Sequence, residues 1–339
     1  MLTPRILKVV GRVPPRGAPP ASNSWRFNIL PAPQTFSSAG SGLEPRHFLI
    51  WQQALSWIYL KRRQLMKTMS NQTSLTAHPR YPELQVDLTF RPIENRNPRQ
   101  LTPGQIQFFN ENGYLPGLRI FSKEEAASIL QFCEGPLTIR MQADAKAAKG
   151  FISYHPLVPE VHALATNPLA LGYLRDLIGP DIICQVSEYI CKRPGDAKPS
   201  TYHQDASFNP LSRAVSVIAW FALDDADEGN GCMRFFAGSH RQGHIPCSGP
   251  REKPPFEIRN PELYGQRVSA ELKAGEVVMF SDLLVHGAPP NPSPTRLRPG
   301  FTFTFCSADI RPYKDWDRSS ILCCGEDRNH NWRVNPKPA

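Results

Sequence analysis

The residues with the clearest chemical potential are His203 and Asp205, followed about 80 residues later by His286. His203 and Asp205 stand two positions apart, so on an extended segment both side chains point to the same face. A histidine from a distant strand can then complete a set of two imidazoles and one carboxylate on one face of a metal. This set leaves three coordination positions open and is typical of non-haem Fe(II) oxygenases. We therefore expect His203, Asp205 and His286 to be metal ligands.

Further motifs surround these three residues in a fixed order. They are Tyr202-His203-Gln204-Asp205, Trp220-Phe221-Ala222-Leu223-Asp224-Asp225, Glu228-Gly229-Asn230-Gly231-Cys232-Met233, Ala237-Gly238-Ser239-His240 and His286-Gly287. Upstream stand Leu101-Thr102-Pro103-Gly104-Gln105 and Phe109-Asn110-Glu111-Asn112-Gly113-Tyr114. Together they resemble the phytanoyl-CoA dioxygenase family over about residues 100–312. That family comprises Fe(II)- and 2-oxoglutarate-dependent oxygenases, including ectoine hydroxylases and many natural-product hydroxylases.

The resemblance implies a reaction as well as a metal. Such an enzyme uses Fe(II), 2-oxoglutarate as cosubstrate and O2, and it hydroxylates or desaturates a small organic molecule while releasing succinate and CO2. Related halogenases carry a small residue at the carboxylate position, which leaves room for a halide. Asp205 at this position therefore favours hydroxylation or desaturation over halogenation.

The resemblance also implies an arginine for the distal carboxylate of 2-oxoglutarate, since a planar guanidinium binds carboxylate through two hydrogen bonds. In the family it follows the second histidine by roughly eleven residues, which here falls on Leu297, between Arg296 and Arg298. Counting back from Phe305-Cys306-Ser307-Ala308-Asp309, which resembles the family's downstream strand end, favours Arg298 and a one-residue insertion. Both arginines have the same strand parity, so parity does not separate them.

Other positions match the family less completely. Gln185 and Trp220 match positions that line the cosubstrate pocket in relatives, although each could equally be a core or sheet residue. The family often has a serine two residues after the second histidine, where this chain has Ala288. We expect His240 to be a structural loop residue. The histidines without a partner at ligand spacing are expected to be surface or structural residues; they are His155, His162, His244 and His330.

The order of predicted elements indicates a mainly β fold with flanking N-terminal helices. Helices are expected to begin at Thr102-Pro103, at Ser122 with a capping box to Glu125, and at Asn167-Pro168. Strands are expected over 182–191, 214–223, 233–236, 276–280 and 300–306, bounded by Gly, Pro, Asn and Asp. This pattern fits a double-stranded β-helix, a jelly roll of the cupin type. The proline-rich segment 246–262 is expected to be a long loop that could cover the site.

The positive net charge of +9 is concentrated at one end of the chain. Residues 1–80 hold 11 lysines and arginines against one acid, Glu44, a balance of +10 that leaves the remaining chain at −1. A nearly neutral remainder without a basic stripe argues against nucleic-acid binding.

We expect three parts: a disordered basic, proline-rich extension (1–80), the dioxygenase domain (81–320) and a C-terminal tail (321–339). The Arg/Ser bias of the first 45 residues suits a mitochondrial transit peptide, whereas prolines at 14, 15, 19 and 20 would break its amphipathic helix. Alternatively, translation starts at Met66 or Met69. The apolar segment 48–60 is shorter than the roughly 20 apolar residues that a membrane span needs, which leaves a membrane-surface helix as a third alternative.

The eight cysteines include no C-x-x-C pair, and no secretory signal precedes them, so neither a zinc site nor a disulfide framework is expected. A reducing cytoplasmic or mitochondrial compartment suits these thiols and Fe(II). The expected partner is a small-molecule substrate: an acyl-CoA, an amino acid or a secondary metabolite. Two alternatives stay open, a non-catalytic metal- or ligand-binding jelly roll and a cofactor-independent or zinc-using cupin enzyme.

Overall fold

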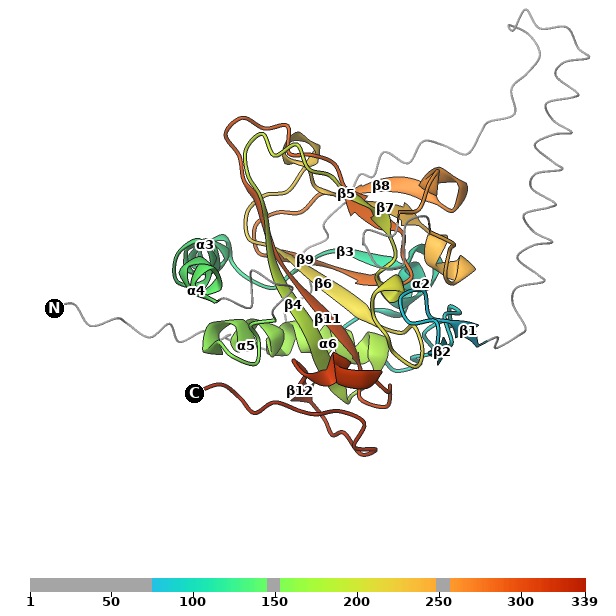
Figure 1. Cartoon of the computed structure of the whole chain (residues 1–339). Coiled ribbons are helices and arrows are strands. Elements are labelled where there is room, and N and C mark those ends of the chain that lie inside the picture. Colours follow the sequence, from blue (N-terminus) through green and yellow to red (C-terminus); the bar gives the residue numbers. More distant parts are fainter. Residues whose placement is uncertain (1–74, 145–152, 248–256) are drawn as a thin grey trace, which may run out of the picture. The chain divides into compact units, whose positions relative to one another are not determined.

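The computed structural model describes residues 75–144, 153–247 and 257–339. Two antiparallel sheets form the centre of this part of the chain (Figure 1). The large sheet has the strand order β12-β4-β11-β6-β9-β3, and the small sheet has the order β5-β10-β7-β8. Neighbours in the sheets are mostly far apart in sequence. The expected jelly roll is confirmed by this pair of sheets.

The strands differ widely in length. The large sheet consists of β3 (Tyr114–Arg119), β4 (Ile182–Lys192), β6 (Val217–Ala222), β9 (Glu276–Ser281), β11 (Arg298–Ser307) and β12 (Ile321–Cys324). The small sheet consists of β5 (Ser200–His203), β7 (Met233–Ala237), β8 (Gln266–Ala270) and β10 (His286–Ala288). A separate pair is formed by β1 (Thr76–Ala77) and β2 (Gln85–Val86). The five predicted strands correspond to β4, β6, β7, β9 and β11. The patterns did not predict β3, β8 or the three- and four-residue strands β5, β10 and β12.

The helices precede most of the sheets in the chain. They are α2 (Pro103–Asn112), α3 (Lys123–Phe132), α4 (Thr138–Ala143), α5 (Pro159–Ala165) and α6 (Pro168–Ile178). Single 3-10 turns occur at Asp205–Ser207, Glu228–Asn230, Ser239–Gln242, Pro261–Leu263 and Lys314–Asp317. Both predicted capping boxes are present, because Thr102 accepts from the backbone of Gln105 and Ser122 accepts from that of Glu125.

One helix continues beyond its predicted end. Gly135 and Pro136 predict that the helix beginning at Ser122 ends there, but a π-helical turn (Cys133–Leu137) leads directly into α4. Pro136 inside this turn has no N–H to donate, and the Thr138 N–H bonds to the Cys133 carbonyl five residues back. The wider turn therefore carries the helix past a proline that would interrupt α-helical bonding.

The large sheet buries both of its faces. Its outer face carries Phe221, Phe301 and Phe303, which belong to the same core cluster as residues of α2, α3 and α6. Its inner face carries residues such as Trp220 and Phe280, which pack against Phe235 of the small sheet. The alternation follows the two-residue period of a strand. Each buried phenylalanine stabilises the fold by about 1.5–3 kcal/mol, and the space between the sheets is where a site can form.

The C-terminal segment packs against the rest of the domain. Residues after 320 are not a separate tail, because β12 pairs with β4 and Trp332 is buried against Ile183 and Cys306. The domain therefore extends past the expected limit at 320. Most of the expected extension (residues 1–74) and the middle of the expected loop over the site (residues 248–256) lie outside the described residues. Among the described residues, no helix is both long and apolar enough to cross a membrane.

Trp332→Ala tests whether the C-terminal segment belongs to the domain. Trp332 is only 7% exposed, so truncating it should lower the free energy of unfolding by about 3–5 kcal/mol, as for a large core aromatic. Urea denaturation followed by fluorescence and circular dichroism measures this change. The matched control is Val334→Ala, which is 41% exposed and should stay within about 0.5 kcal/mol of wild type. Equal stability of all three proteins would restore the boundary at 320.

Candidate active site

The pairing of β5 with β10 brings the two predicted histidine ligands together. These strands are antiparallel, and His203 lies directly opposite His286. The centroids of the two imidazole rings are 4.3 Å apart. Asp205 is the first residue of the 3-10 turn Asp205–Ser207, whereas we expected it on the same extended segment as His203. Gln204 between them still has extended backbone angles, which keeps His203 and Asp205 on the same side.

The three side chains converge on one point. Oδ1 of Asp205 is 3.3 Å from Nε2 of His203 and 3.7 Å from Nε2 of His286. One ligand atom from each of the three residues lies within 4.8 Å of the other two. In the part of the chain that the structure describes, no other group of three histidine, cysteine or acidic residues meets this condition. The geometry fits two imidazoles and one carboxylate facing a single metal ion.

Backbone carbonyls orient both imidazoles. Nδ1 of His203 is 2.6 Å from the Thr201 carbonyl oxygen, and Nδ1 of His286 is 3.0 Å from that of Leu284. Donation of Nδ1–H to a carbonyl leaves the Nε2 lone pair free and turned toward Asp205. Metal-binding histidines generally make such a hydrogen bond through the nitrogen that does not bind the metal, because it fixes both the tautomer and the ring orientation.

The protonation of the site also suits a metal. Burial lowers the pKa of His286 to about 4, so its imidazole is neutral at neutral pH. Burial acts to raise the pKa of Asp205, but the neighbouring His286 and His203 outweigh it and keep that pKa below its usual range. Metal binding needs a neutral imidazole and an ionised carboxylate, and these two residues supply them.

Gln204, between His203 and Asp205, positions the loops behind the ligands, a role that we did not predict from the sequence. Its Nε2 donates to the carbonyls of Gly243 and Leu283 at 2.9 and 2.6 Å, and its Oε1 accepts from the Ile245 N–H at 2.8 Å. The amide is fully buried and ties together the two loops behind the ligands. Alternation along the strand was the available signal, because the residue between two same-face ligands must point the other way.

Arg298 is a buried cation without a partner. It begins β11, is 2% exposed, and forms no hydrogen bond or ion pair with any described residue. Its guanidinium carbon lies 5.2 Å from the centre of a Trp220 ring, and the indole N–H of Trp220 is likewise buried without a partner. Burial lowers the pKa of Arg298 to about 10, which leaves it charged at neutral pH. An unpaired buried charge is costly, so the site is prepared for an anion.

Gly300 makes this arrangement possible. A Cβ added at this position would lie 2.1 Å from an atom of the Trp220 indole. Glycine therefore lets the Trp220 indole pack closely against β11, next to Arg298.

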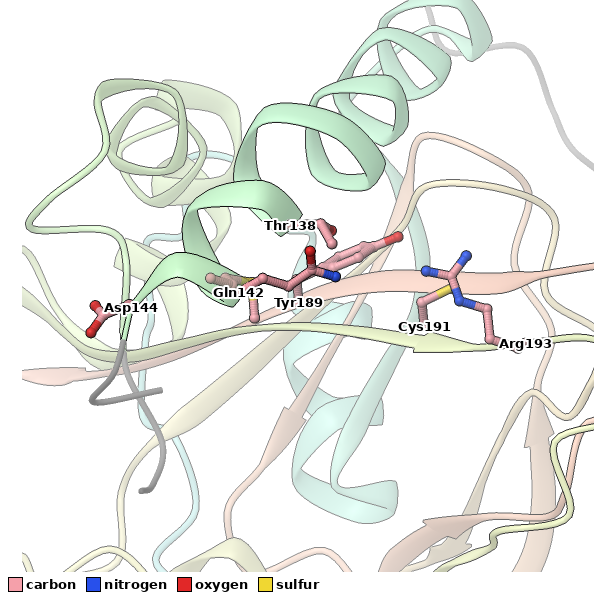
Figure 2. A pocket seen from close by; sticks show the side chains of 7 residues that line it. Thr138, Gln142, Asp144, Tyr189, Cys191 and Arg193 are labelled. Atoms are coloured by element: carbon pink, nitrogen blue, oxygen red, sulfur yellow. The ribbon is translucent and has the colours of Figure 1, made fainter. Parts of the chain in front are cut away.

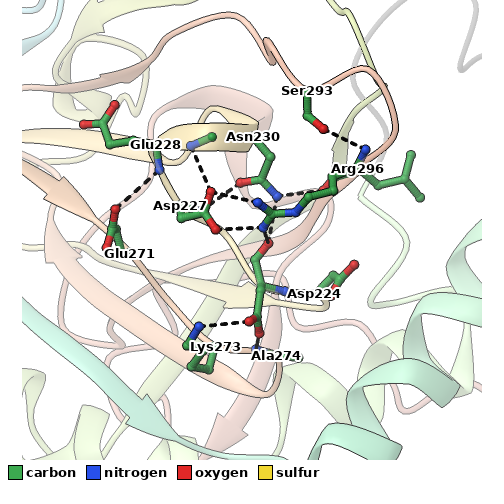
Figure 3. A network of polar contacts seen from close by, with 12 residues as sticks. Asp224, Asp227, Glu228, Asn230, Glu271, Lys273, Ala274, Ser293 and Arg296 are labelled. Atoms are coloured by element: carbon green, nitrogen blue, oxygen red, sulfur yellow. Dashed lines mark hydrogen bonds and ion pairs between the residues drawn. The ribbon is translucent and has the colours of Figure 1, made fainter.

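Arg296 has a different environment, shown in Figure 3. Its Nη1 and Nη2 donate to the two carboxylate oxygens of Asp227 at 3.0 and 2.8 Å. Its side chain is 43% exposed, and it precedes the first residue of β11, so strand parity does not apply to it. Arg296 thus already has a carboxylate partner within the protein, whereas Arg298 has none among the described residues.

The remaining predicted site residues have protein partners. Gln185 is buried; its Oε1 accepts from Trp316 Nε1 at 2.9 Å, and its Nε2 is 3.4 Å from Ser216 Oγ. Its role in cosubstrate binding therefore stays a prediction. His240 is buried and contacts the Asn110 carbonyl, as expected for a structural residue. Ala288, where relatives often have serine, is buried in β10.

A pocket of about 450 Å³ lies elsewhere (Figure 2). It is lined by residues of α4, by Tyr189 and Cys191 from the odd-numbered side of β4, and by Arg193 directly after β4. Tyr189 contacts Phe301 on the outer face of the large sheet, so this pocket is on the face opposite to Trp220. It is distinct from the histidine and aspartate cluster.

Comparison with known proteins assigns the family. A model described as phytanoyl-CoA dioxygenase (PhyH) matches residues 109–300, which is more than half of the chain. The chain belongs to the phytanoyl-CoA dioxygenase family. The matched segment contains all three candidate metal ligands, together with Gln185, Trp220 and Arg298.

Individual members of the phytanoyl-CoA dioxygenase family resemble the chain over part of their length. Peroxisomal phytanoyl-CoA dioxygenase of Bos taurus is 26% identical over 219 residues, which cover 56% of this chain and 64% of the relative. The ectoine dioxygenase of Bordetella parapertussis is 28% identical over 225 residues, covering 57% and 72%. The chain thus spans slightly less than two thirds of the Bos taurus protein.

A solved structure of similar fold extends the comparison. CytC3 with Fe(II) and alpha-ketoglutarate superposes with a TM-score of 0.51 at 19% identity, covering 69% of this chain and 93% of that one. At this identity the likeness shows a shared fold.

Replacing any one of His203, Asp205 and His286 by alanine should remove a direct metal ligand. Loss of a residue that merely orients a ligand typically weakens metal binding about 10–100-fold, so we expect at least a 100-fold loss of Fe(II) affinity without unfolding. Anaerobic equilibrium dialysis against Fe(II), with circular dichroism in parallel, measures both. His162→Ala is the control, since His162 lies on α5 and is not one of the clustered residues. Wild-type Fe(II) affinity in any of the three variants would contradict the ligand assignment.

Proposed function

We propose that the protein is an Fe(II)- and 2-oxoglutarate-dependent dioxygenase that hydroxylates or desaturates a small organic molecule and releases succinate and CO2. The observation that carries the proposal is the convergence of His203, Asp205 and His286, each of which has a ligand atom within 4.8 Å of those of the other two. Membership of the phytanoyl-CoA dioxygenase family supports the same reaction class. Asp205 favours hydroxylation or desaturation, because a carboxylate ligand fills the position that a halide would need.

The donor set fits iron. Two imidazoles and a carboxylate on one face of the ion leave three positions for cosubstrate and O2. When bound, Fe(II) supplies O2 activation coupled to the oxidative decarboxylation of 2-oxoglutarate. The protein's part is to orient the two imidazoles through the Thr201 and Leu284 carbonyls, to keep His286 neutral by burial and to keep Asp205 ionised.

Arg298 would bind the distal carboxylate of 2-oxoglutarate. Its guanidinium can donate two parallel hydrogen bonds to a carboxylate, and it has no partner among the described residues that would compete. Trp220 would form the wall beside this carboxylate, with its unpaired indole N–H as a further donor. Because the arginine is buried, its attraction for an anion is weakly screened.

We also propose a reducing compartment and a small-molecule substrate for the protein. All eight cysteines are free thiols, which supports a reducing compartment such as the cytoplasm or the mitochondrion. The alternative of a non-catalytic jelly roll predicts that a metal ligand or the arginine would be lost, and the chain has retained all of them. We therefore retain a small-molecule substrate as the partner.

Anaerobic titration of the full chain with Fe(II) and then 2-oxoglutarate tests the proposed function. We expect a visible charge-transfer absorption that needs both additions and saturates at one equivalent of each. Succinate release on admission of O2 should follow. A zinc-using or non-catalytic jelly roll would give neither signal.

Arg298→Ala should raise the 2-oxoglutarate concentration needed for this absorption by roughly 100-fold. Leaving the buried carboxylate of 2-oxoglutarate unpaired should cost about 3 kcal/mol of binding free energy, and each 1.4 kcal/mol is a tenfold change in affinity. Fe(II) binding should survive. Arg298→Lys should recover only part of the affinity, since a point charge cannot replace the guanidinium fork. Arg296→Ala is the control and should bind 2-oxoglutarate almost normally. An exchange of the two alanine phenotypes would identify Arg296 as the ligand, and no effect in either would overturn the cosubstrate site.

A further inference from the structure

A second charged residue, Glu188, lies on the inner face of the large sheet. It is on β4, where it pairs with Thr302 of β11, and Thr302 in turn pairs with Trp220 of β6. Residues directly across a sheet project to the same face. Glu188, Thr302 and Trp220 therefore form one row on the face that packs against the small sheet.

Its neighbours along β4 confirm this orientation. Tyr189 contacts Phe301 on the outer face, and Figure 2 shows Tyr189 and Cys191 directed toward α4. Successive side chains of a strand point to opposite faces, so Glu188 points away from α4 and into the space between the sheets.

Glu188 also interacts electrostatically with one of the candidate metal ligands, Asp205. Desolvation, and then the negative charge of Asp205, raise the pKa of Glu188 to about 7. Thr302, the partner of Glu188 on β11, is four residues along the strand from Arg298, which is about 13 Å at 3.3 Å per residue. Glu188 therefore lies away from the end of the site that holds Arg298.

The carboxylate of Glu188 has no partner. It forms no hydrogen bond or ion pair with any residue that the structure describes, although its side chain is solvent-accessible. Other acids near the sheets are paired with arginine, as in Glu134 with Arg193, Glu228 with Arg234 and Glu276 with Arg119. An accessible but partly desolvated carboxylate that faces a reaction site is suited to contact a ligand.

The cosubstrate is a poor candidate for this ligand. 2-Oxoglutarate is a dianion that Glu188 would repel, and Arg298 already provides for its distal carboxylate. The substrate is the remaining molecule that must lie next to the metal. A carboxylate accepts its strongest hydrogen bonds from a positively charged nitrogen, and it disfavours phosphate or carboxylate groups nearby.

We propose that Glu188 binds a cationic nitrogen of the substrate, so that the enzyme acts on a small amine or an amino-bearing metabolite in preference to an acyl-CoA or other anion. Thr302, accessible in the same row, adds a hydroxyl beside this nitrogen. The inference rests on the proposed function, because it takes the histidine and aspartate cluster to be the reaction centre.

The test uses the full chain loaded with Fe(II) and 2-oxoglutarate and a panel of primary and quaternary amines. Each amine is accompanied by the alcohol and the carboxylic acid of the same carbon skeleton, and acyl-CoA thioesters are included. The readouts are the shift of the anaerobic absorption on addition of each compound and succinate release in O2. We expect amines to be the class that gives both signals.

Three variants locate the effect. Glu188→Gln keeps the size of the side chain and removes its charge, so half-maximal stimulation should need about 10-fold more amine or higher. Glu188→Lys should shift the preference toward the carboxylic acids. Glu94→Gln is the matched control, because Glu94 is exposed and forms no hydrogen bond or ion pair with any residue that the structure describes. Its amine response should equal that of wild type.

The outcomes separate the two proposals. Absence of the Fe(II) and 2-oxoglutarate absorption in wild type, before any amine is added, would mean that the proposed function fails. If that absorption forms but stimulation comes from acids or thioesters, or from no amine, the role of Glu188 is refuted. An unchanged amine response in Glu188→Gln refutes it as well.

Discussion

The antiparallel pairing of two very short strands, β5 and β10, is the constraint on which the site depends. Because His203 and His286 are directly opposite each other on the two strands, the centroids of their imidazole rings lie only 4.3 Å apart. Gly287 permits this close approach, since a Cβ there would lie 2.7 Å from the Ser200 carbonyl oxygen. β10 is fixed on its other edge by β7, where His286 is opposite Phe235. The small sheet therefore serves to hold two metal ligands in register.

The large sheet supplies the charges that surround this centre. Its inner face is mainly apolar, and Phe280 packs on the ring of His286 at 4.7 Å between centroids. Against this background, Arg298 and Glu188 stand out as charged side chains without partners among the described residues. Their signs are opposite, and they act on different parts of the site. A cation for the cosubstrate and an anion for the substrate would together orient two ligands around one metal.

The sequence predicted those parts of the site that depend on local spacing. His203 and Asp205 are two residues apart, and the longer strands β4, β6, β9 and β11 are recognisable by composition. The short strands β5, β10 and β12 were missed, because three or four residues carry too little periodicity to identify a strand. The π-helical turn at Pro136 was missed for a related reason, since proline followed by a helix-forming segment normally indicates an end.

Contacts between distant residues were beyond the reach of the sequence. Arg296 and Arg298 could not be separated by parity, and they differ because Asp227, 69 residues away, pairs with Arg296. The face of the sheet on which Glu188 lies follows from its pairing with Thr302 of β11, which no pattern in either strand reveals.

A crystal structure of the full chain grown anaerobically with Fe(II) and 2-oxoglutarate tests the central claim most directly. The account predicts one iron bound by His203 Nε2, a carboxylate oxygen of Asp205 and His286 Nε2, with the distal carboxylate of 2-oxoglutarate on the guanidinium of Arg298. An iron bound without one of these three side chains, or a cosubstrate carboxylate that does not contact Arg298, would contradict it.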